Sequence, residues 1–182
     1  MPKSKAEVLR RARKIKLILM DVDGVLADGR ISLVVEPDGS ARELKSFNSL
    51  DGAGIRLAQR AGLRTGIITG RESPPVAARA RELGIDFVEQ DAFEKLPAYE
   101  KIRAASGLGD AEICFIGDDV TDLPCLIRVG LAVSVPNAHE EALKRAHYVT
   151  RRRGGEGAVR VVVDLILRAQ GKYAAVLRHF LK

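Results

Sequence analysis

Acidic residues follow two apolar segments of the sequence. Residues 17–24 read Leu-Ile-Leu-Met-Asp-Val-Asp-Gly, so Asp21 and Asp23 lie at the end of an apolar run. Residues 113–119 repeat the pattern as Ile-Cys-Phe-Ile-Gly-Asp-Asp, and Asp122 follows three positions later. Carboxylates that meet at one edge of a parallel sheet repel one another unless a cation lies between them, and oxygen ligands suit Mg²⁺. The pattern therefore predicts a Mg²⁺-dependent site for phosphoryl chemistry.

Two further segments supply what phosphoryl transfer needs besides acids. Such a reaction uses a nucleophile, a proton donor for the leaving oxygen and positive charge around the migrating group. The run Thr69-Gly70-Arg71 offers a hydroxyl and backbone amides to a phosphate oxygen, and Lys95 offers a point charge. An aspartate can be the nucleophile, and Asp118 would complete the Mg²⁺ ligands. All these residues fall where an expected strand ends.

The composition is that of a globular protein. The chain has 182 residues, of which 46% are hydrophobic, so one domain spanning residues 1–182 is expected. Its longest apolar runs are strand-sized and far short of the roughly 20 residues that a membrane span needs. The amino terminus has no secretory pattern, and Cys114 and Cys125 are expected to be buried thiols. We expect a cytoplasmic protein without membrane contact.

Charge is distributed unevenly along the chain. The net charge is +6, but residues 1–16 hold seven Lys/Arg against Glu7 alone, and residues 151–182 hold eight against Glu156 and Asp164. The intervening residues carry a net charge of −6. A basic end can bind phosphate on nucleic acid, on a small substrate, or nothing. Because the body is acidic, we do not expect nucleic acid as a partner.

Strand and helix patterns alternate after a short amphipathic segment at residues 4–14. This alternation, with short connections, predicts an α/β fold: a three-layer, Rossmann-like parallel sheet with helices on both faces. The expected strands are 15–20, 64–69, 86–89, 112–117, 131–135 and 147–149. The expected helices are 52–61, 74–83, 95–106, 121–128, 139–145 and 158–169 or beyond.

Residues 30–47 break this alternation. They read as two short strands around Pro37-Asp38-Gly39, which is a turn signal, and so predict a β-hairpin. A hairpin inserted after the first strand of a parallel sheet does not belong to the alternation of strands and helices. We expect it to project, and to use its apolar residues for contact with another subunit. The alternative is a hairpin folded back onto its own domain.

The ordered set Asp21-x-Asp23, Thr69, Lys95 and Gly117-Asp118-Asp119-x-x-Asp122 resembles the haloacid dehalogenase-like phosphohydrolases over residues 15–170. The resemblance implies an aspartyl-phosphate mechanism with Asp21 as nucleophile and Asp23 as general acid/base. It also implies that Asp21, Asp118 and the main-chain carbonyl of Asp23 bind Mg²⁺. By the same resemblance, Thr69, Gly70 and Lys95 would bind the phosphate. Asp119 and Asp122 would hold the metal indirectly or orient Lys95.

Other motifs resemble the capless branch of that family, which includes the phosphatases of 3-deoxy-D-manno-octulosonate 8-phosphate and of KDN and N-acylneuraminate 9-phosphates. They are the run at 21–29, the hairpin, Lys45-x-Phe47-x-x-x-Asp51-Gly52-x-Gly54, Ile68-Thr69-Gly70-Arg71 and the glycine-rich segment 154–160. The resemblance implies hydrolysis of the octulosonate phosphate, in lipopolysaccharide sugar synthesis, by a homotetramer in which the segment Gly154–Arg160 folds over a neighbouring site. The residues expected to bind the sugar acid are Lys45, Asp51, Arg71 and Arg160.

The sequence leaves alternatives open for the substrate, the class of protein and the roles of two residues. The 9-phosphates, or sugar phosphates in general, are the competing substrates, and a phosphate-binding module or an RNA-binding protein are the non-enzymatic alternatives. Lys95 could be a solvated lysine at a helix start, and Asp122 a plain helix cap. The residues before Lys95 have fewer small polar side chains than the family pattern, and Arg151–Arg153 is unusually basic. Both departures bear on the identity of the sugar more than on the chemistry.

Overall fold

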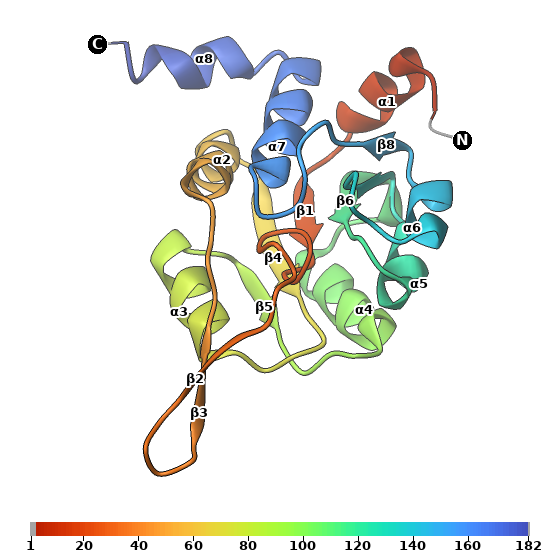
Figure 1. Cartoon of the computed structure of the whole chain (residues 1–182). Helices are drawn as coiled ribbons and strands as arrows, with labels where there is room; N and C mark the ends of the chain where they lie inside the picture. The colour runs from red at the N-terminus through yellow and green to blue at the C-terminus, as the bar shows by residue number, and fades with distance from the viewer. Residues whose placement is uncertain (1–2, 182) are drawn as a thin grey trace.

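The computed structural model describes residues 3–181, which form a parallel β-sheet covered by helices on both faces (Figure 1). The sheet has six strands in the order β5-β4-β1-β6-β7-β8, and every pairing within it is parallel. The strands are β1 (Leu17–Met20), β4 (Arg64–Ile68), β5 (Phe87–Glu89), β6 (Ile113–Ile116), β7 (Leu131–Ser134) and β8 (Tyr148–Val149). The predicted fold class is confirmed.

The register of the central strands places their carboxyl ends together. Met20 of β1 pairs with Ile67 of β4 on one side and with Ile116 of β6 on the other. The residues that follow these three strands therefore leave the sheet side by side. In open α/β sheets this edge, beside the strand where the order reverses, is where ligands bind.

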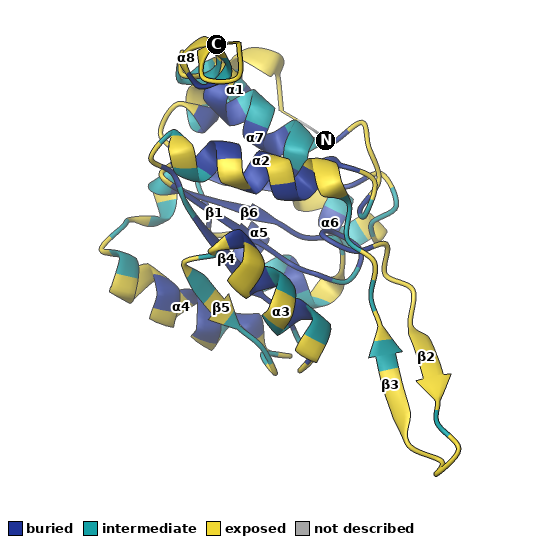
Figure 2. Cartoon of the chain, turned by 90° about the vertical axis from the view of Figure 1, so that its left-hand side faces the viewer, coloured by how far each residue is buried: buried dark blue, intermediate teal, exposed yellow. Residues whose placement is uncertain are grey.

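Alternate side chains of each strand point to opposite faces, which gives the protein two hydrophobic cores. The helices are α1 (Lys5–Ala12), α2 (Ser49–Arg60), α3 (Pro74–Leu83), α4 (Lys95–Ser106), α5 (Leu123–Leu126), α6 (Glu140–Arg145), α7 (Ala158–Ala169) and α8 (Tyr173–Arg178). Ile18 and Met20 pack under α1, α2, α3 and α7, whereas Leu17 and Leu19 pack against α4, α5 and α6. Buried side chains accordingly lie between the sheet and its helices in Figure 2.

The segment after β1 forms the predicted hairpin, made of β2 (Ser32–Val35) and β3 (Ala41–Leu44). It extends away from the helices and the sheet, and nearly all of it is exposed (Figure 2). Its turn is closed by a hydrogen bond from Glu36 N to Ser40 O. Apolar side chains on it face solvent, including Val35 at 70% exposure. The hairpin therefore does not fold back onto its own domain.

Some helices differ from the expected ranges for local reasons. Helix α2 begins at Ser49 rather than at 52 because the Asn48 side chain accepts a hydrogen bond from Leu50 N and caps it. The segment expected as a helix at 121–128 is divided into a 3₁₀ turn, Val120–Asp122, and the short α5. Beyond α7 the chain turns at Gly171, whose φ is +69°, and then forms the separate helix α8.

Two further expectations concern the whole chain. Cys114 and Cys125 are free and buried, as predicted. Across residues 3–181, no helix combines the length and apolar character required to cross a membrane.

Candidate active site

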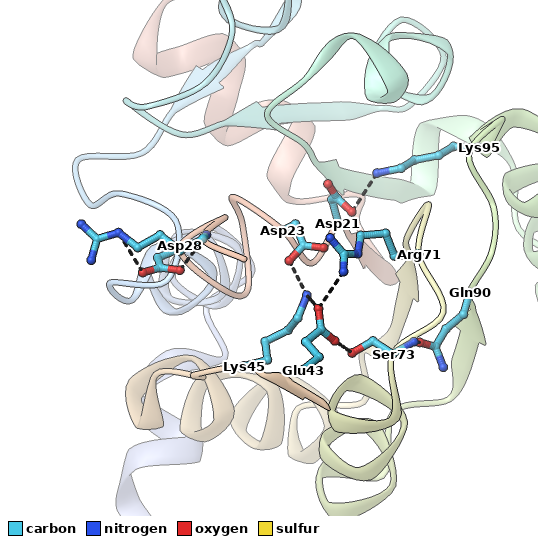
Figure 3. A network of polar contacts seen from close by, with 10 residues as sticks. Asp21, Asp23, Asp28, Glu43, Lys45, Arg71, Ser73, Gln90 and Lys95 are labelled. Carbon is cyan, nitrogen blue, oxygen red and sulfur yellow. Dashed lines mark hydrogen bonds and ion pairs between the residues drawn. The ribbon is translucent and has the colours of Figure 1, made fainter. Parts of the chain in front are cut away.

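Four charged side chains meet at the carboxyl edge of the sheet. Asp21 follows β1, Asp118 follows β6 and Lys95 begins α4. The Lys95 ammonium lies 2.8 Å from Oδ1 of Asp21 and 2.5 Å from Oδ1 of Asp122 (Figure 3 shows Asp21 and Lys95). Lys95 is 2% exposed, so it is not a solvated lysine at a helix start. The structure thus brings together residues that are up to 101 positions apart in the sequence.

Asp122 is engaged on both of its oxygens. Oδ1 accepts from Lys95, while Oδ2 accepts backbone N–H groups of Asp118 at 2.8 Å and Asp119 at 3.1 Å. It makes no side-chain cap bond to α5, so the plain helix-cap interpretation does not describe it. Asp122 instead orients Lys95 and fixes the backbone that carries Asp118. The Asp119 side chain is exposed and accepts from Val120 N.

The carboxylates fit a cation. Oxygens of Asp21, Asp118 and Asp122 lie within 4.8 Å of one another. Within the described part of the chain, Oδ1 of Asp118 is buried and has no hydrogen-bond partner. A buried carboxylate oxygen without a partner is costly, and a hard cation such as Mg²⁺ would satisfy it. Both oxygens of Asp122 are already engaged, whereas Asp21 contacts Lys95 through Oδ1 alone, so Asp118 and the second oxygen of Asp21 are the best-placed ligands for the metal.

Close packing shapes the loop that carries these ligands. Gly24 has a φ of +91°, and a Cβ there would lie 2.0 Å from Oδ2 of Asp118. Any larger residue at this position would displace the Asp118 carboxylate. Glycine is therefore required here both for its backbone conformation and for the room it leaves.

The electrostatics of the metal-free cluster are unfavourable for three ionised carboxylates. Burial, together with the charge of Asp122, raises the pKa of Asp21 to about 6. Burial and the charges of Asp21 and Asp122 raise the pKa of Asp118 to about 8. Burial alone would lower the pKa of Lys95, but the charges of Asp21 and Asp122 outweigh it and raise that pKa. Lys95 therefore stays charged, and a divalent cation would relieve the remaining repulsion.

The second predicted aspartate lies in a separate network (Figure 3). Asp23 forms an ion pair with Lys45, whose ammonium also lies 3.4 Å from Oε1 of Glu43. The same Oε1 accepts from Arg71 at 3.1 Å, and Oε2 of Glu43 accepts from the Ser73 hydroxyl. Lys45 and Arg71 are two of the residues expected to bind substrate. Lys45 thus contacts Asp23 directly, and Arg71 is joined to Lys45 through Glu43.

The segment after β4 runs beside the cluster. Thr69 is 2% exposed, and its backbone is fixed at both ends: Thr69 N donates to Glu89 O, and Thr69 O accepts from Ala92 N, each at 3.0 Å. A Cβ on Gly70 would meet Phe93 at 3.4 Å, so the backbone passes close to the loop that leads to Lys95. This arrangement suits a phosphate oxygen bound between Thr69 and Lys95.

Two expected substrate-binding residues, Asp51 and Arg160, have partners within the protein. Asp51 is fully buried, and its carboxylate accepts Gly157 N at 3.2 Å and Arg160 N at 2.8 Å, at the start of α7. The Arg160 side chain pairs with Asp164 on the same helix at 2.8 Å. These contacts show that Asp51 caps a helix and that Arg160 pairs within one, and the expected binding of substrate by either residue stays a prediction.

The glycine-rich segment contacts its own chain, where Gly155 N donates to Val25 O at 2.9 Å. The expectation that residues 154–160 also fold over a neighbouring site stays a prediction. A Cβ on Gly154 would lie 1.6 Å from Gly24 O, so the two loops are in backbone contact. The segment supports its own Asp21–Gly24 loop. Arg151–Arg153 is exposed, as a solvated charge run would be.

Glu43 and Ser73 were not predicted as site residues. Glu43, Lys45 and Phe47 alternate along one face of the strand that leaves the hairpin, and all three are half-buried while Leu44 is exposed. That two-residue period, counted back from Lys45, was the available signal. Ser73 carried no comparable signal, because its contact with Glu43 depends on the path of the hairpin.

A parallel sheet that presents an aspartate pair, a threonine, a lysine and a further aspartate at successive strand ends defines a phosphohydrolase of the haloacid dehalogenase type. Comparison with known families agrees: the haloacid dehalogenase-like hydrolase family matches residues 39–130. The chain belongs to this family.

Individual relatives lie within one branch of it. The chain is 44% identical over 166 residues to the 3-deoxy-D-manno-octulosonate 8-phosphate phosphatase KdsC of Yersinia pestis, covering 91% of this chain and 87% of that protein. It is also similar to the solved enzyme of that name from Moraxella catarrhalis, in complex with magnesium, phosphate and KDO (TM-score 0.91, 38% identity, 97% of this chain and 99% of that one). A cobalt-bound relative from Haemophilus influenzae has a TM-score of 0.85 at 34% identity, over 94% and 99% of the two chains.

Proposed function

We propose that this chain is a Mg²⁺-dependent phosphatase that hydrolyses 3-deoxy-D-manno-octulosonate 8-phosphate to the free sugar acid and inorganic phosphate. The observation that carries the proposal is the buried cluster in which Asp21 lies 2.8 Å from Lys95 and beside the unpartnered oxygen of Asp118. Relatives more than 40% identical across nine-tenths of the chain carry that activity in their names. A binding module would not need Asp23 as well as Asp21, whereas hydrolysis needs a proton donor beside the nucleophile.

The reaction follows from the positions of two aspartates. A carboxylate oxygen of Asp21 attacks phosphorus, the bond to the sugar oxygen breaks, and Asp23 protonates that oxygen as it leaves. The Asp23 carboxylate then takes a proton from water, whose oxygen attacks the aspartyl phosphate and releases phosphate and Asp21. Lys95 holds positive charge beside the transferred group throughout. When bound by Asp21, Asp118 and the Asp23 carbonyl, Mg²⁺ would offset charge on the phosphate oxygens.

The substrate carries a carboxylate at one end and a phosphate at the other. Arg71 follows Gly70 directly and its side chain is 45% exposed, which supports the proposal that it binds the sugar acid. An arginine binds a carboxylate through two parallel hydrogen bonds, which favours this substrate over a neutral sugar phosphate. Lys45 is less available, because Asp23 and Glu43 already hold it.

Phosphate release measured with Mg²⁺ and with EDTA tests the proposal. The substrates are 3-deoxy-D-manno-octulosonate 8-phosphate, KDN 9-phosphate, N-acetylneuraminate 9-phosphate and a hexose 6-phosphate. We expect an EDTA-sensitive preference for the octulosonate phosphate. Equal slow rates on all four would retain the mechanism and reject the substrate, and no release by folded protein would support a phosphate-binding module.

We also propose that the chain assembles as a homotetramer through its hairpins. Ile31, Leu33, Val35 and Leu44 are each at least half exposed on a projecting hairpin, and burial against other copies would remove this apolar surface from water. Light scattering tests the assembly: the natural chain should be tetrameric, and Val35→Lys should be smaller. A monomeric natural chain would contradict the proposal.

Two further proposals concern the domain organisation and the cellular compartment. We propose one domain for residues 1–182, since both cores lie against the same sheet. The free, buried thiols of Cys114 and Cys125 favour a reducing compartment, and we propose the cytoplasm.

A further inference from the structure

Glu43 joins the projecting hairpin to the candidate active site. It lies on β3, the strand that returns from the hairpin tip, opposite Leu33 of β2. Side chains of a strand alternate between its faces, and Glu43 and Lys45 share the face turned toward the body of the protein. Its carboxylate side chain is 11% exposed although β2, the strand paired with it, is exposed along its whole length. A carboxylate in that position needs partners.

Those partners come from three places in the chain. Oε1 of Glu43 lies 3.1 Å from Arg71 and 3.4 Å from Lys45, and Oε2 accepts the Ser73 hydroxyl (Figure 3). Burial alone would raise the pKa of Glu43, but the hydrogen bond from Ser73 and the charges of Lys45 and Arg71 hold it below its usual value. Ser73 is itself fixed, because its N–H donates to the Gln90 side chain at 2.9 Å. The carboxylate is therefore ionised and held in place.

This arrangement constrains Arg71. A guanidinium has five N–H donors in a rigid plane, so one firm contact sets the direction of the others. Glu43 takes a donor from Nη2, and the side chain remains 45% exposed next to the phosphate segment. Without Glu43, a long and exposed arginine would sample many rotamers, and ordering it would reduce the affinity for substrate.

Glu43 also constrains Lys45. Its side chain is 2% exposed and lies between Asp23 and Glu43, so two carboxylates share one ammonium group. Removing the charge of Glu43 would leave Lys45 with Asp23 alone. Glu43 thus contacts both Lys45, which pairs with Asp23, and the partly exposed Arg71.

We propose that Glu43 is a positioning residue that orients Arg71 for the carboxylate of the substrate and that couples the hairpin to this recognition. The inference rests on the proposed function, since it assigns a task to Arg71 on an acidic substrate. It adds a residue that acts through Arg71 without touching the reacting atoms. A change in the path of the hairpin would reach Arg71 through the Glu43 side chain.

Steady-state kinetics of Glu43→Gln on two substrates test the inference. The first is 3-deoxy-D-manno-octulosonate 8-phosphate, and the second is p-nitrophenyl phosphate, which has no carboxylate. We expect kcat/KM on the sugar acid to fall about 10-fold to 100-fold, mainly through KM, because a misplaced contact costs on this order. The value on p-nitrophenyl phosphate should change far less, and Glu43→Asp should restore part of the loss.

A matched control comes from the same hairpin. Glu36 pairs with Arg42 near the hairpin turn and is remote from the cluster, so Glu36→Gln should leave both substrates unaffected. The double variant Glu43→Gln/Arg71→Ala should lose no more than Arg71→Ala alone, because one residue acts through the other. If Glu43→Gln fails to fold, Ser73→Ala removes a contact of the same carboxylate and should give the same selective loss.

The outcomes separate the inference from the proposed function. Equal losses on both substrates, or additive losses in the double variant, would overturn the positioning role and leave a structural one. If the natural chain itself shows no preference for the sugar acid over other phosphates, the proposed function fails first. The inference fails alone when that preference exists and Glu43→Gln retains it.

Discussion

Lys95 donates from its buried ammonium to Oδ1 of Asp122 at 2.5 Å, across 27 positions of the sequence. This contact joins the start of α4 to the loop after β6. The other oxygen of Asp122 accepts the N–H groups of Asp118 and Asp119. One carboxylate therefore holds both the Lys95 ammonium and the backbone of Asp118, an expected metal ligand.

Replacing Asp122 should damage the fold as well as activity. We expect Asp122→Ala to lower the free energy of unfolding by about 3–5 kcal/mol, since it leaves buried charged and polar partners uncompensated. Urea unfolding measures this. Asp119→Ala is the control, because its side chain is exposed and accepts only local backbone N–H groups, that of Val120 among them, and its cost should be within about 1 kcal/mol. Equal costs for the two variants would show that Asp122 does not organise the site.

Replacing Asp21 should remove catalysis and leave the fold intact. Asp21→Asn keeps the shape of the side chain but cannot form an aspartyl phosphate, so kcat should fall at least about 10³-fold. In EDTA at pH 8 the variant should melt no lower than the natural chain, because burial and the charge of Asp122 already disfavour the ionised form. Asp38→Asn, in the exposed hairpin turn, is the matched control and should retain full activity. Substantial turnover by Asp21→Asn would exclude Asp21 as nucleophile.

The stability of the metal-free protein should depend on pH between about 4 and 8. The pKa of Asp21 is raised to about 6 and that of Asp118 to about 8, each first by burial. The folded state then binds protons more tightly than the unfolded state, so the stabilisation is complete below the unfolded pKa and is lost as pH rises through the folded values.

Magnesium replaces those protons, so it should raise the melting temperature more at pH 8 than at pH 5.5. Thermal melts with Mg²⁺ and with EDTA at the two pH values check this. Asp118→Asn should flatten the pH dependence in EDTA and reduce the response to Mg²⁺. An equal magnesium shift at both pH values would mean that the cation binds elsewhere.

Much of this architecture could be predicted because its signals are local. Apolar runs such as Leu17–Met20 and Ile113–Ile116 mark strands, and the acidic residues directly after them must reach one edge of a parallel sheet. Asp21, Asp118 and Lys95 therefore meet as expected, although their catalytic and binding roles stay predictions. The hairpin was predictable for the same reason, from a turn signal between two short strands.

The parts that sequence reasoning missed depend on tertiary contacts between distant segments. Nothing near Asp51 in sequence shows that α7, more than 100 positions later, starts against its carboxylate. Likewise, the neighbours of Glu43 do not show that Ser73 and Arg71 lie beside it. A polar residue close to a motif is as readily a support for the backbone as a ligand for substrate, and only the packing distinguishes the two.

Asp51 gives this distinction a direct test. Its two oxygens accept N–H groups of Gly157 and Arg160, which otherwise have no partner within their helix, so Asp51→Ala should cost about 1–3 kcal/mol of unfolding free energy. Asp51→Asn keeps one acceptor oxygen and should cost less. If Asp51 is a helix cap, KM for the sugar phosphate should stay the same in whatever fraction of either variant is folded. A raised KM at unchanged stability would instead support the prediction that Asp51 binds substrate, and equal stability of all three proteins would show that α7 does not depend on this cap.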